Sequence, residues 1–265
     1  MTTRDSVRQR PAVRRIPAVA IVVYGVAILA WVAILRRWLP MPGGEMGMEM
    51  RMSDPGAPEA MALEGGAVGV ALYLIMWGTM MIAMMYPSSV PLFRLYDGTL
   101  REVSRAARFA RLGALLGTYT LVWTITGLVP LAVNAAVPIA PLATDHGPLL
   151  FGGVLVLLGG YQLSPYKYRC LDRCRSPFGF LLTYHRPGVV GAARMGWEFS
   201  RFCVGCCWAL FALMVVAGSM NVLWMAGIAV VLSLERTVSW GPQLARAVGA
   251  VAAVGGVALL AVAMV

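Results

Sequence analysis

Charged residues, histidines and early cysteines are all scarce in this chain. Only 13% of the residues are charged and 59% are hydrophobic, whereas a typical soluble domain is about 25% charged and roughly 45–50% apolar. The two histidines, His146 and His185, are too few for a multi-histidine metal site. All five cysteines lie between Cys170 and Cys207, so the N-terminal half of the chain has no thiol. This composition argues against a water-soluble fold.

Several apolar runs reach the length of about 20 residues that a helix needs to cross a bilayer. They predict seven spans, at 17–35, 67–86, 112–137, 147–163, 203–219, 221–235 and 246–264. The run at 221–235 is short, and with 203–219 it can also form a hairpin that does not cross fully. We therefore predict an all-α fold, a polytopic integral membrane helix bundle with about seven transmembrane helices in a lipid bilayer.

The basic residues are distributed unevenly around these spans. With the N-terminus in the cytoplasm, all but three of the 22 Lys and Arg residues fall on the cytoplasmic side, the exceptions being Arg36, Arg37 and Arg51. Such asymmetry orients membrane proteins, so the C-terminus is expected to be periplasmic. The same distribution explains the net charge of +10 without a nucleic-acid partner. We predict a basic cytoplasmic N-terminus at 1–16 and a single membrane domain at 17–265.

A predicted external loop at 38–66 is rich in methionine. Met46, Met48, Met50 and Met52 alternate with other residues, so in an extended segment they point the same way. Thioethers are soft, neutral ligands that suit Cu(I). A hydrophobic side chain in an exposed loop has little to pack against, which favours metal capture over simple filling. The Pro and Gly residues of the loop predict that it forms no stable helix.

A second methionine group lies in the second predicted span. Met76, Met80 and Met84 recur every four residues and share one helical face, flanked by Met81 and Met85. Methionine also packs well inside helix bundles, so copper ligation and ordinary packing both stay open. The spacing is similar to the M-x-x-x-M spacing of eukaryotic copper importers, which are shorter trimeric proteins with three spans.

The cysteines form two groups, one in a predicted cytoplasmic segment at 164–202 and one at the start of the next span. The first group comprises Cys170 and Cys174, and the second comprises Cys203, Cys206 and Cys207. Cytoplasmic thiols stay reduced, and nearby Arg and Lys are expected to lower their pKa and favour the metal-binding thiolate. We predict that the first group folds back against the second to form one metal site. The alternative is that these cysteines are small buried hydrophobic residues.

Two other functions are compatible with the cysteines. A non-transporting assembly or scaffold protein would hold a structural zinc with four thiolates. A membrane thiol redox enzyme would use the Cys-x-x-Cys spacing that begins at Cys203, but the βαβ context of such sites is missing. No nucleotide loop or Ser-His-Asp arrangement is visible, so we do not expect an enzyme. Glu198 and Glu235 lie near the inner ends of predicted spans, where we expect either snorkelling or pairing with Arg201 and Arg236.

Several motifs resemble those of a bacterial family of predicted metal-binding integral membrane proteins, some of which are called copper chaperones. They are the stretch Trp77–Pro87, the stretch Gly160–Pro165 with Lys167, Cys170-Leu171 and Cys174-Arg175, the stretch Cys203–Trp208, and the stretch Gly218–Met225. The likeness extends over about residues 68–240 and does not include the methionines at 46–52. It implies metal binding in a bacterial inner membrane and supplies no mechanism.

These features together favour an inner-membrane protein that binds Cu(I) and transfers it or takes it up. The external methionines would collect the ion, the second span would carry it, and the cysteines would receive it. Thiolates bind more strongly than thioethers, so the order of sites favours import or delivery. A soluble copper chaperone or a cuproenzyme assembly factor is the expected partner, zinc is the alternative metal, and an oligomer is compatible with the sequence.

Overall fold

The computed structural model describes residues 18–39 and 53–264, and every regular element in these two ranges is a helix. The helices are α1 (Ala18–Leu35), α3 (Ala57–Glu64), α4 (Gly66–Thr99), α5 (Arg105–Ile125), α6 (Leu128–Ala136), α7 (Ile139–Gln162), α8 (Pro165–Arg175), α9 (Pro177–Tyr184), α10 (Gly188–Val216), α11 (Val222–Thr237) and α12 (Gly241–Ala263). The predicted all-α fold is confirmed.

Six helical stretches of the described chain are long and apolar enough to cross a membrane, namely α1, α4, α5 with α6, α7, α10 and α12. Helix α11 has 16 residues and corresponds to the short run predicted at 221–235. The chain is therefore a multi-pass membrane helix bundle, in agreement with the hydropathy. Two helices are longer than expected, since α4 continues past residue 86 and α10 begins well before residue 203.

Helix α4 continues through Pro87 and Pro91, and at Pro87 a neighbouring group satisfies the freed backbone carbonyl. A proline lacks an N–H and leaves the carbonyl group four residues earlier without its helical partner. For Pro87 this is the carbonyl of Ala83, and the indole N–H of Trp31 in α1 donates to it at 3.1 Å. Helix α4 therefore continues past its methionines, which all precede Pro87.

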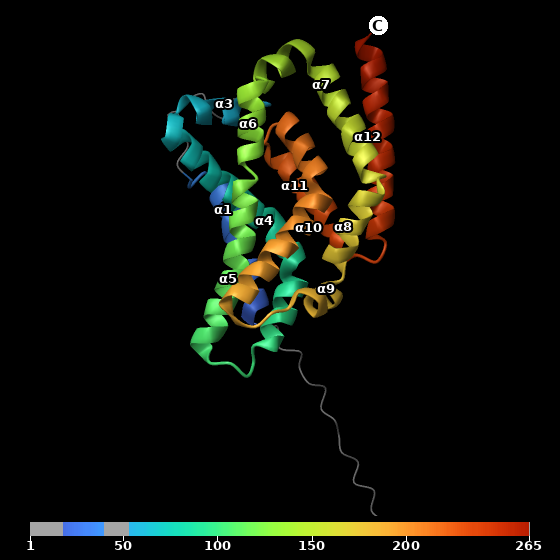
Figure 1. The fold of residues 1–265 in the computed structure, drawn as a ribbon. Helices are drawn as coiled ribbons and strands as arrows, with labels where there is room; N and C mark the ends of the chain where they lie inside the picture. Colours follow the sequence, from blue (N-terminus) through green and yellow to red (C-terminus); the bar gives the residue numbers. More distant parts are fainter. Residues whose placement is uncertain (1–17, 40–52, 265) are drawn as a thin grey trace, which may run out of the picture.

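Figure 1 shows an elongated bundle whose two ends differ. Helix α3 and the C-terminal end of α12 lie at one end, the α3 end. The turn between α10 and α11 is at this end too, because Ser219 in the turn bonds to Glu59 of α3. Helix α9 and the connection between α4 and α5 lie at the opposite end, the α9 end. The α3 end and the α9 end of the bundle are therefore formed by different helices and connections.

Helices α4 and α10 form the centre of the bundle. The most apolar stretch of each is 56% buried, against 17% in α7 and 22% in α12. Between α4, α5 and α10, the ring of Tyr119 packs against Phe93 and Phe199 with centroids 5.7 and 5.5 Å apart. The outward faces of α7 and α12 suit contact with lipid, while the sulfur-bearing parts of α4 and α10 are surrounded by protein.

The prediction that residues 38–66 form no stable helix is wrong for α3. Pro58 stands in the first turn of α3, where proline has no hydrogen bond to lose and its fixed φ suits a helix. Gly56 precedes α3 with φ of 72°, a left-handed conformation that glycine adopts without strain. Helix α3 packs against α4 and α6 and leaves its Glu59 with 0% exposure.

Candidate metal centre

The five methionines of α4 are all buried. Met76, Met80, Met81, Met84 and Met85 have at most 4% of their surface exposed. The helix places three of them on one face, at positions 76, 80 and 84, as the spacing predicts. This burial agrees with copper ligation and with packing, so the surroundings of these methionines have to distinguish the two. We call the five methionines of α4 the methionine row.

The methionine row ends beside a buried arginine. Met85 Sδ lies 3.9 Å from Nη1 of Arg236 in α11. The same guanidinium donates to Ser88 Oγ at 2.8 Å, and its Nη2 lies 3.1 Å from Cys203 Sγ in α10. Arg236 therefore contacts both the last methionine of α4 and the first cysteine of α10.

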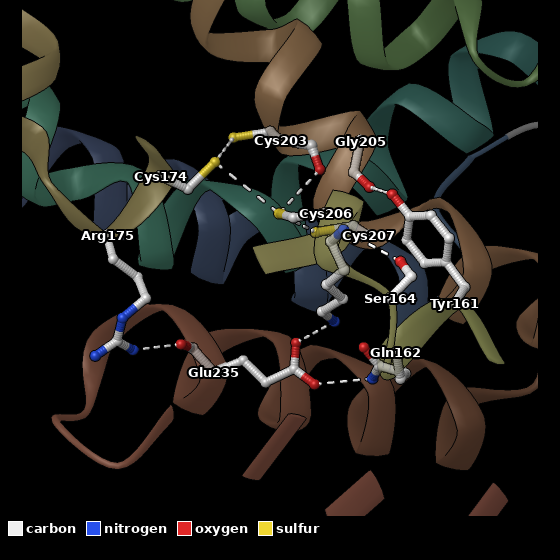
Figure 2. Close-up of polar contacts among 11 residues, drawn as sticks. Tyr161, Gln162, Ser164, Cys174, Arg175, Cys203, Gly205, Cys206, Cys207 and Glu235 are labelled. Atoms are coloured by element: carbon white, nitrogen blue, oxygen red, sulfur yellow. Dashed lines mark hydrogen bonds and ion pairs between the residues drawn. The ribbon is translucent and has the colours of Figure 1, made fainter. Parts of the chain in front are cut away.

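Four cysteine sulfurs meet between α8 and α10 (Figure 2). Cys174 Sγ of α8 lies 3.6 Å from Cys203 Sγ and 3.9 Å from Cys206 Sγ, and Cys206 Sγ lies 3.2 Å from Cys207 Sγ. Two sulfurs that each bind one metal ion at about 2.3 Å are roughly 3.8 Å apart in tetrahedral geometry and about 4.6 Å apart in linear geometry. The two separations from Cys174 are close to this range, so small side-chain movements would place several sulfurs on one ion.

The predicted approach of the two cysteine groups is confirmed by these distances for Cys174. The other cysteine of α8, Cys170, packs its sulfur against α10 at Gly205 and is only partly buried. Among residues 18–39 and 53–264, no group of three or more His, Cys, Asp or Glu side chains has the arrangement of a metal site. The sulfurs of Cys174, Cys203, Cys206 and Cys207 thus form a chain of neighbours.

The expected lowering of thiol pKa values by nearby basic residues is wrong for the two cysteines of α8. Burial raises the pKa of Cys170, and the neighbouring Cys206 and Cys203 add to it, while Arg201 opposes them. The hydrogen bonds of Cys174 with the same two cysteines, together with burial, raise its pKa well above the ordinary value. These two groups are therefore protonated thiols at neutral pH, and they would release protons when a metal binds.

A buried ion pair lies beside the cysteine cluster. Lys167 Nζ of α8 is 2.6 Å from Glu235 Oε2 of α11, and both side chains are 1% exposed. Gln162 Nε2 donates to the other carboxylate oxygen at 2.9 Å, and Arg175 donates to the backbone carbonyl of Glu235 (Figure 2). The pair links α8 to α11 and so fixes Cys174 relative to Arg236.

Of the two ion pairs that the sequence suggested as an alternative to snorkelling, one is confirmed and the other is wrong. Glu198 and Arg201 pair at 2.8 Å on α10. Glu235 does not pair with Arg236, because successive residues of a helix point about 100° apart. Glu235 faces α8, whereas Arg236 faces α4 and α10.

The external methionines at 46–52 lie outside the described residues. The next described residue is Ser53, whose backbone carbonyl packs against Gly218 in the turn between α10 and α11. Gly218 has φ of 100°, and a side chain at this position would collide with the carbonyl. The segment that follows the external methionines is therefore held at the α3 end of the bundle.

Sequence reasoning did not assign the buried ionisable residues Glu59, Lys167 and Arg236 to the candidate site, although it named Lys167 in a family motif and Arg236 as a partner for Glu235. Ionisable groups in or beside apolar segments are a recognised sign of function or of buried pairing, and this signal was available for all three. The partners of these residues could not be read from the sequence, since Lys167 and Glu235, for example, are 68 residues apart in the chain.

The fold and this core define a class: a multi-pass membrane protein with buried thioether and thiol groups that meet at one arginine. The chain belongs to the PpoB2 family, described as copper chaperone, whose profile matches residues 74–259. The matched range contains the α4 methionines and all five cysteines, and the family resemblance seen in the sequence is confirmed. No curated protein and no solved structure matches the chain.

Proposed function

We propose that this protein accepts Cu(I) at the α3 end, passes it along the methionines of α4, and holds it at the cysteine cluster for delivery. The main support is that the methionines of α4 and the cysteines of α10 meet at one buried side chain, because Arg236 contacts both Met85 and Cys203. The description of the family as copper chaperone supports copper as the cargo.

Each transfer step is a ligand exchange in which one copper–sulfur bond forms while another breaks. Thioethers bind Cu(I) without losing a proton, so passage between Met80 and Met84 needs no proton transfer. At the cysteines a thiol proton leaves as the copper–thiolate bond forms. Two thiolates and one Cu(I) ion carry a net negative charge, which the guanidinium of Arg236 compensates.

We further propose that the protein lies in a bacterial inner membrane with the α3 end facing the periplasm. The concentration of Arg and Lys in the α4–α5 connection and in the α8–α10 region supports a cytoplasmic α9 end. Reporter fusions at Asp54 and Val265 should report a periplasmic location, and a fusion at Gly188 a cytoplasmic one. A cytoplasmic Val265 would contradict this arrangement and mean that α11 does not cross the membrane.

The partly buried Cys170 is the cysteine we assign to exchange with a soluble copper chaperone or a cuproenzyme assembly factor. It is the cysteine on the α8 surface, and Arg169 and Arg173 are exposed on the same helix. A partner with an acidic surface around its own copper site would fit these charges.

Metal analysis of the reduced, purified protein tests the proposal. After exposure to equal amounts of Cu(I) and Zn(II), the protein should retain about one Cu(I) ion per chain, since two thiolates suffice for this metal. A Cys203→Ala, Cys206→Ala double variant should retain almost none.

Other outcomes would identify the rival functions. Selective retention of zinc would overturn the proposal in favour of a scaffold protein with a structural zinc. An oxidised Cys203–Cys206 pair in protein purified without reductant, with no copper retained after reduction, would overturn it in favour of a thiol redox enzyme.

A further inference from the structure

Glu59 is a buried carboxyl group at the α3 end with one oxygen that has no partner. Its side chain has 0% exposure. Oε1 accepts hydrogen bonds from Tyr73 Oη and Ser219 Oγ, each at 2.8 Å, whereas Oε2 has no hydrogen-bond partner in the described chain. Burying a polar atom without a partner is unfavourable, and buried ionisable groups in membrane proteins are commonly functional.

The position of Glu59 relates it to both methionine groups. Tyr73 stands three residues before Met76 on α4, so the two side chains share a helical face. Ser219 belongs to the turn that Ser53 contacts through Gly218, and Ser53 directly follows the external methionines in the sequence. Glu59 therefore lies between the end of the external methionine segment and the first methionine of the α4 row.

We propose that Glu59 is a cation-exchange site at the outer end of the methionine row, where an arriving Cu(I) ion replaces a proton on the carboxyl group. The O–H bond breaks, the proton leaves to water on the α3 side, and the cation is bound at Oε2 before it passes to Met76. The net charge of the site stays the same. This inference rests on the proposed function for the identity of the cation.

The exchange at Glu59 supplies the negative charge that the methionine row lacks. Neutral thioethers cannot compensate a positive charge, and charges interact strongly in a low-dielectric interior. A carboxylate at the outer end supplies the counter-charge where the ion leaves water. Burial raises the pKa of Glu59, with the hydrogen bonds from Ser219 and Tyr73 opposing it, so the empty site favours the protonated form.

The described groups that bond to the Glu59 carboxyl include one titratable side chain, that of Tyr73. Tyr73 is the titratable group that contacts Glu59 from α4, α6 has no titratable side chain, and the α10–α11 turn contributes a hydroxyl. On α7, Asp145 and His146 are exposed, and Glu64 on α3 itself is exposed. The protonation state of Glu59 therefore sets the charge of the site.

Glu59→Gln removes the charge and keeps an oxygen that accepts from Tyr73 and Ser219. Glu64→Gln, on the exposed side of α3, is the matched control.

Proteoliposomes with the α3 side outward would receive external Cu(I), and the initial rate of copper loading at the cysteines would be measured. The rate should fall about tenfold in Glu59→Gln, which corresponds to ~1.4 kcal/mol in the barrier. The control should load at the wild-type rate, and copper bound by detergent-solubilised protein at equilibrium should be equal in all three.

The outcomes separate this inference from the proposed function. Wild-type protein that binds no copper in detergent would overturn both. Wild-type protein that loads copper no faster than Glu59→Gln would overturn the exchange site alone. Tyr73→Phe keeps the charge and removes one hydrogen bond, so it should load within about twofold of the wild type; a loss equal to that of Glu59→Gln would show that the hydrogen bonds matter and the charge does not.

Thermal unfolding in detergent gives a second readout. A carboxyl group whose pKa is raised by folding does not destabilise the protein in acid, where it is protonated in both states. It becomes destabilising as the pH rises past the ordinary pKa of glutamate, about 4.3, until the folded-state carboxyl ionises. Glu59→Gln should therefore unfold at a higher temperature than the wild type at neutral pH and at the same temperature near pH 4. A lower unfolding temperature at neutral pH would overturn the proposal, because the carboxyl would then serve the fold.

Discussion

The methionines of α4 and the cysteines of α8 and α10 are buried to a similar degree but have different surroundings. Met80 and Met84 have at most 1% exposure, as do Cys203 and Cys207. Arg236 contacts the cysteine cluster and the Lys167–Glu235 pair lies beside it, whereas the methionines of α4 meet a charged group at Met85. A neutral thioether can be buried without a counter-charge, but a thiolate cannot. The charges therefore favour the cysteine cluster over the methionines of α4 as the tighter site of the proposed pathway.

The difference also bears on the proposed transfer from the methionines of α4 to the cysteines. If both regions bind Cu(I), a neutral site binds it more weakly than a thiolate site with a compensating cation. The carboxyl of Glu59 at the outer end and the guanidinium of Arg236 at the inner end then mark the two places where charge has to be balanced. Between these ends, the row needs no ionisable group.

The largest effect is expected from breaking the ion pair beside the cysteines. Lys167→Met leaves the carboxylate of Glu235 buried without its counter-ion, and such a loss destabilises a protein by about 3–5 kcal/mol. Thermal unfolding in detergent would measure the change, with exposed Arg169→Met on the same helix as the control. Equal unfolding temperatures for Lys167→Met and the control would show that the pair does not stabilise this region.

The next effect concerns copper affinity. Cys206 contacts both Cys174 and Cys207, so Cys206→Ala should weaken Cu(I) binding by about 100-fold, or ~2.7 kcal/mol. Competition with a Cu(I) chelator would measure it. Cys170→Ala should leave the affinity within a few-fold and slow exchange with a soluble partner. An affinity unchanged in Cys206→Ala would remove the cluster from the proposed pathway.

Hydropathy and helical spacing predicted much of this arrangement. The long apolar runs give the membrane helices, and the spacing of Met76, Met80 and Met84 gives their shared face. The approach of Cys174 to Cys203 was also predictable from the confinement of the cysteines to one region. These features depend on local sequence, which is why sequence alone was sufficient.

The rest depends on contacts between distant segments. Nothing near Glu235 in the sequence shows that Lys167 is its partner, since helix packing brings the two together. The thiol pKa values of α8 were misjudged because burial of Cys170, and the hydrogen bonds of Cys174 with Cys203 and Cys206, outweigh the nearby arginines, and both depend on how the whole bundle packs. Helix α3 was missed because Pro58 was taken as a helix breaker, although in a first turn it favours a helix.

A smaller effect is expected from the methionines of α4. Replacing Met80 and Met84 with Leu conserves volume, so each change should cost under ~1.5 kcal/mol of stability. If these side chains carry copper, the transfer rate should fall at every external copper concentration while cysteine binding in detergent stays normal. An unchanged rate in normally inserted protein would assign the methionines to packing, and the conduit would have to be abandoned even with the cysteine site intact.

The smallest effect is expected outside the bundle. Replacing Met46, Met48, Met50 and Met52 with Leu keeps the apolar bulk and removes the sulfur groups that the loop offers. Capture at the loop limits transfer only when external copper is scarce, because at high concentration the ion can reach the α3 end directly. Copper uptake by cells should therefore decrease at low external copper and match the wild type at high copper. A decrease of the same proportion at both concentrations would mean that the loop is an obligatory step, and the contrast between a dispensable outer methionine group and an essential inner one would no longer hold.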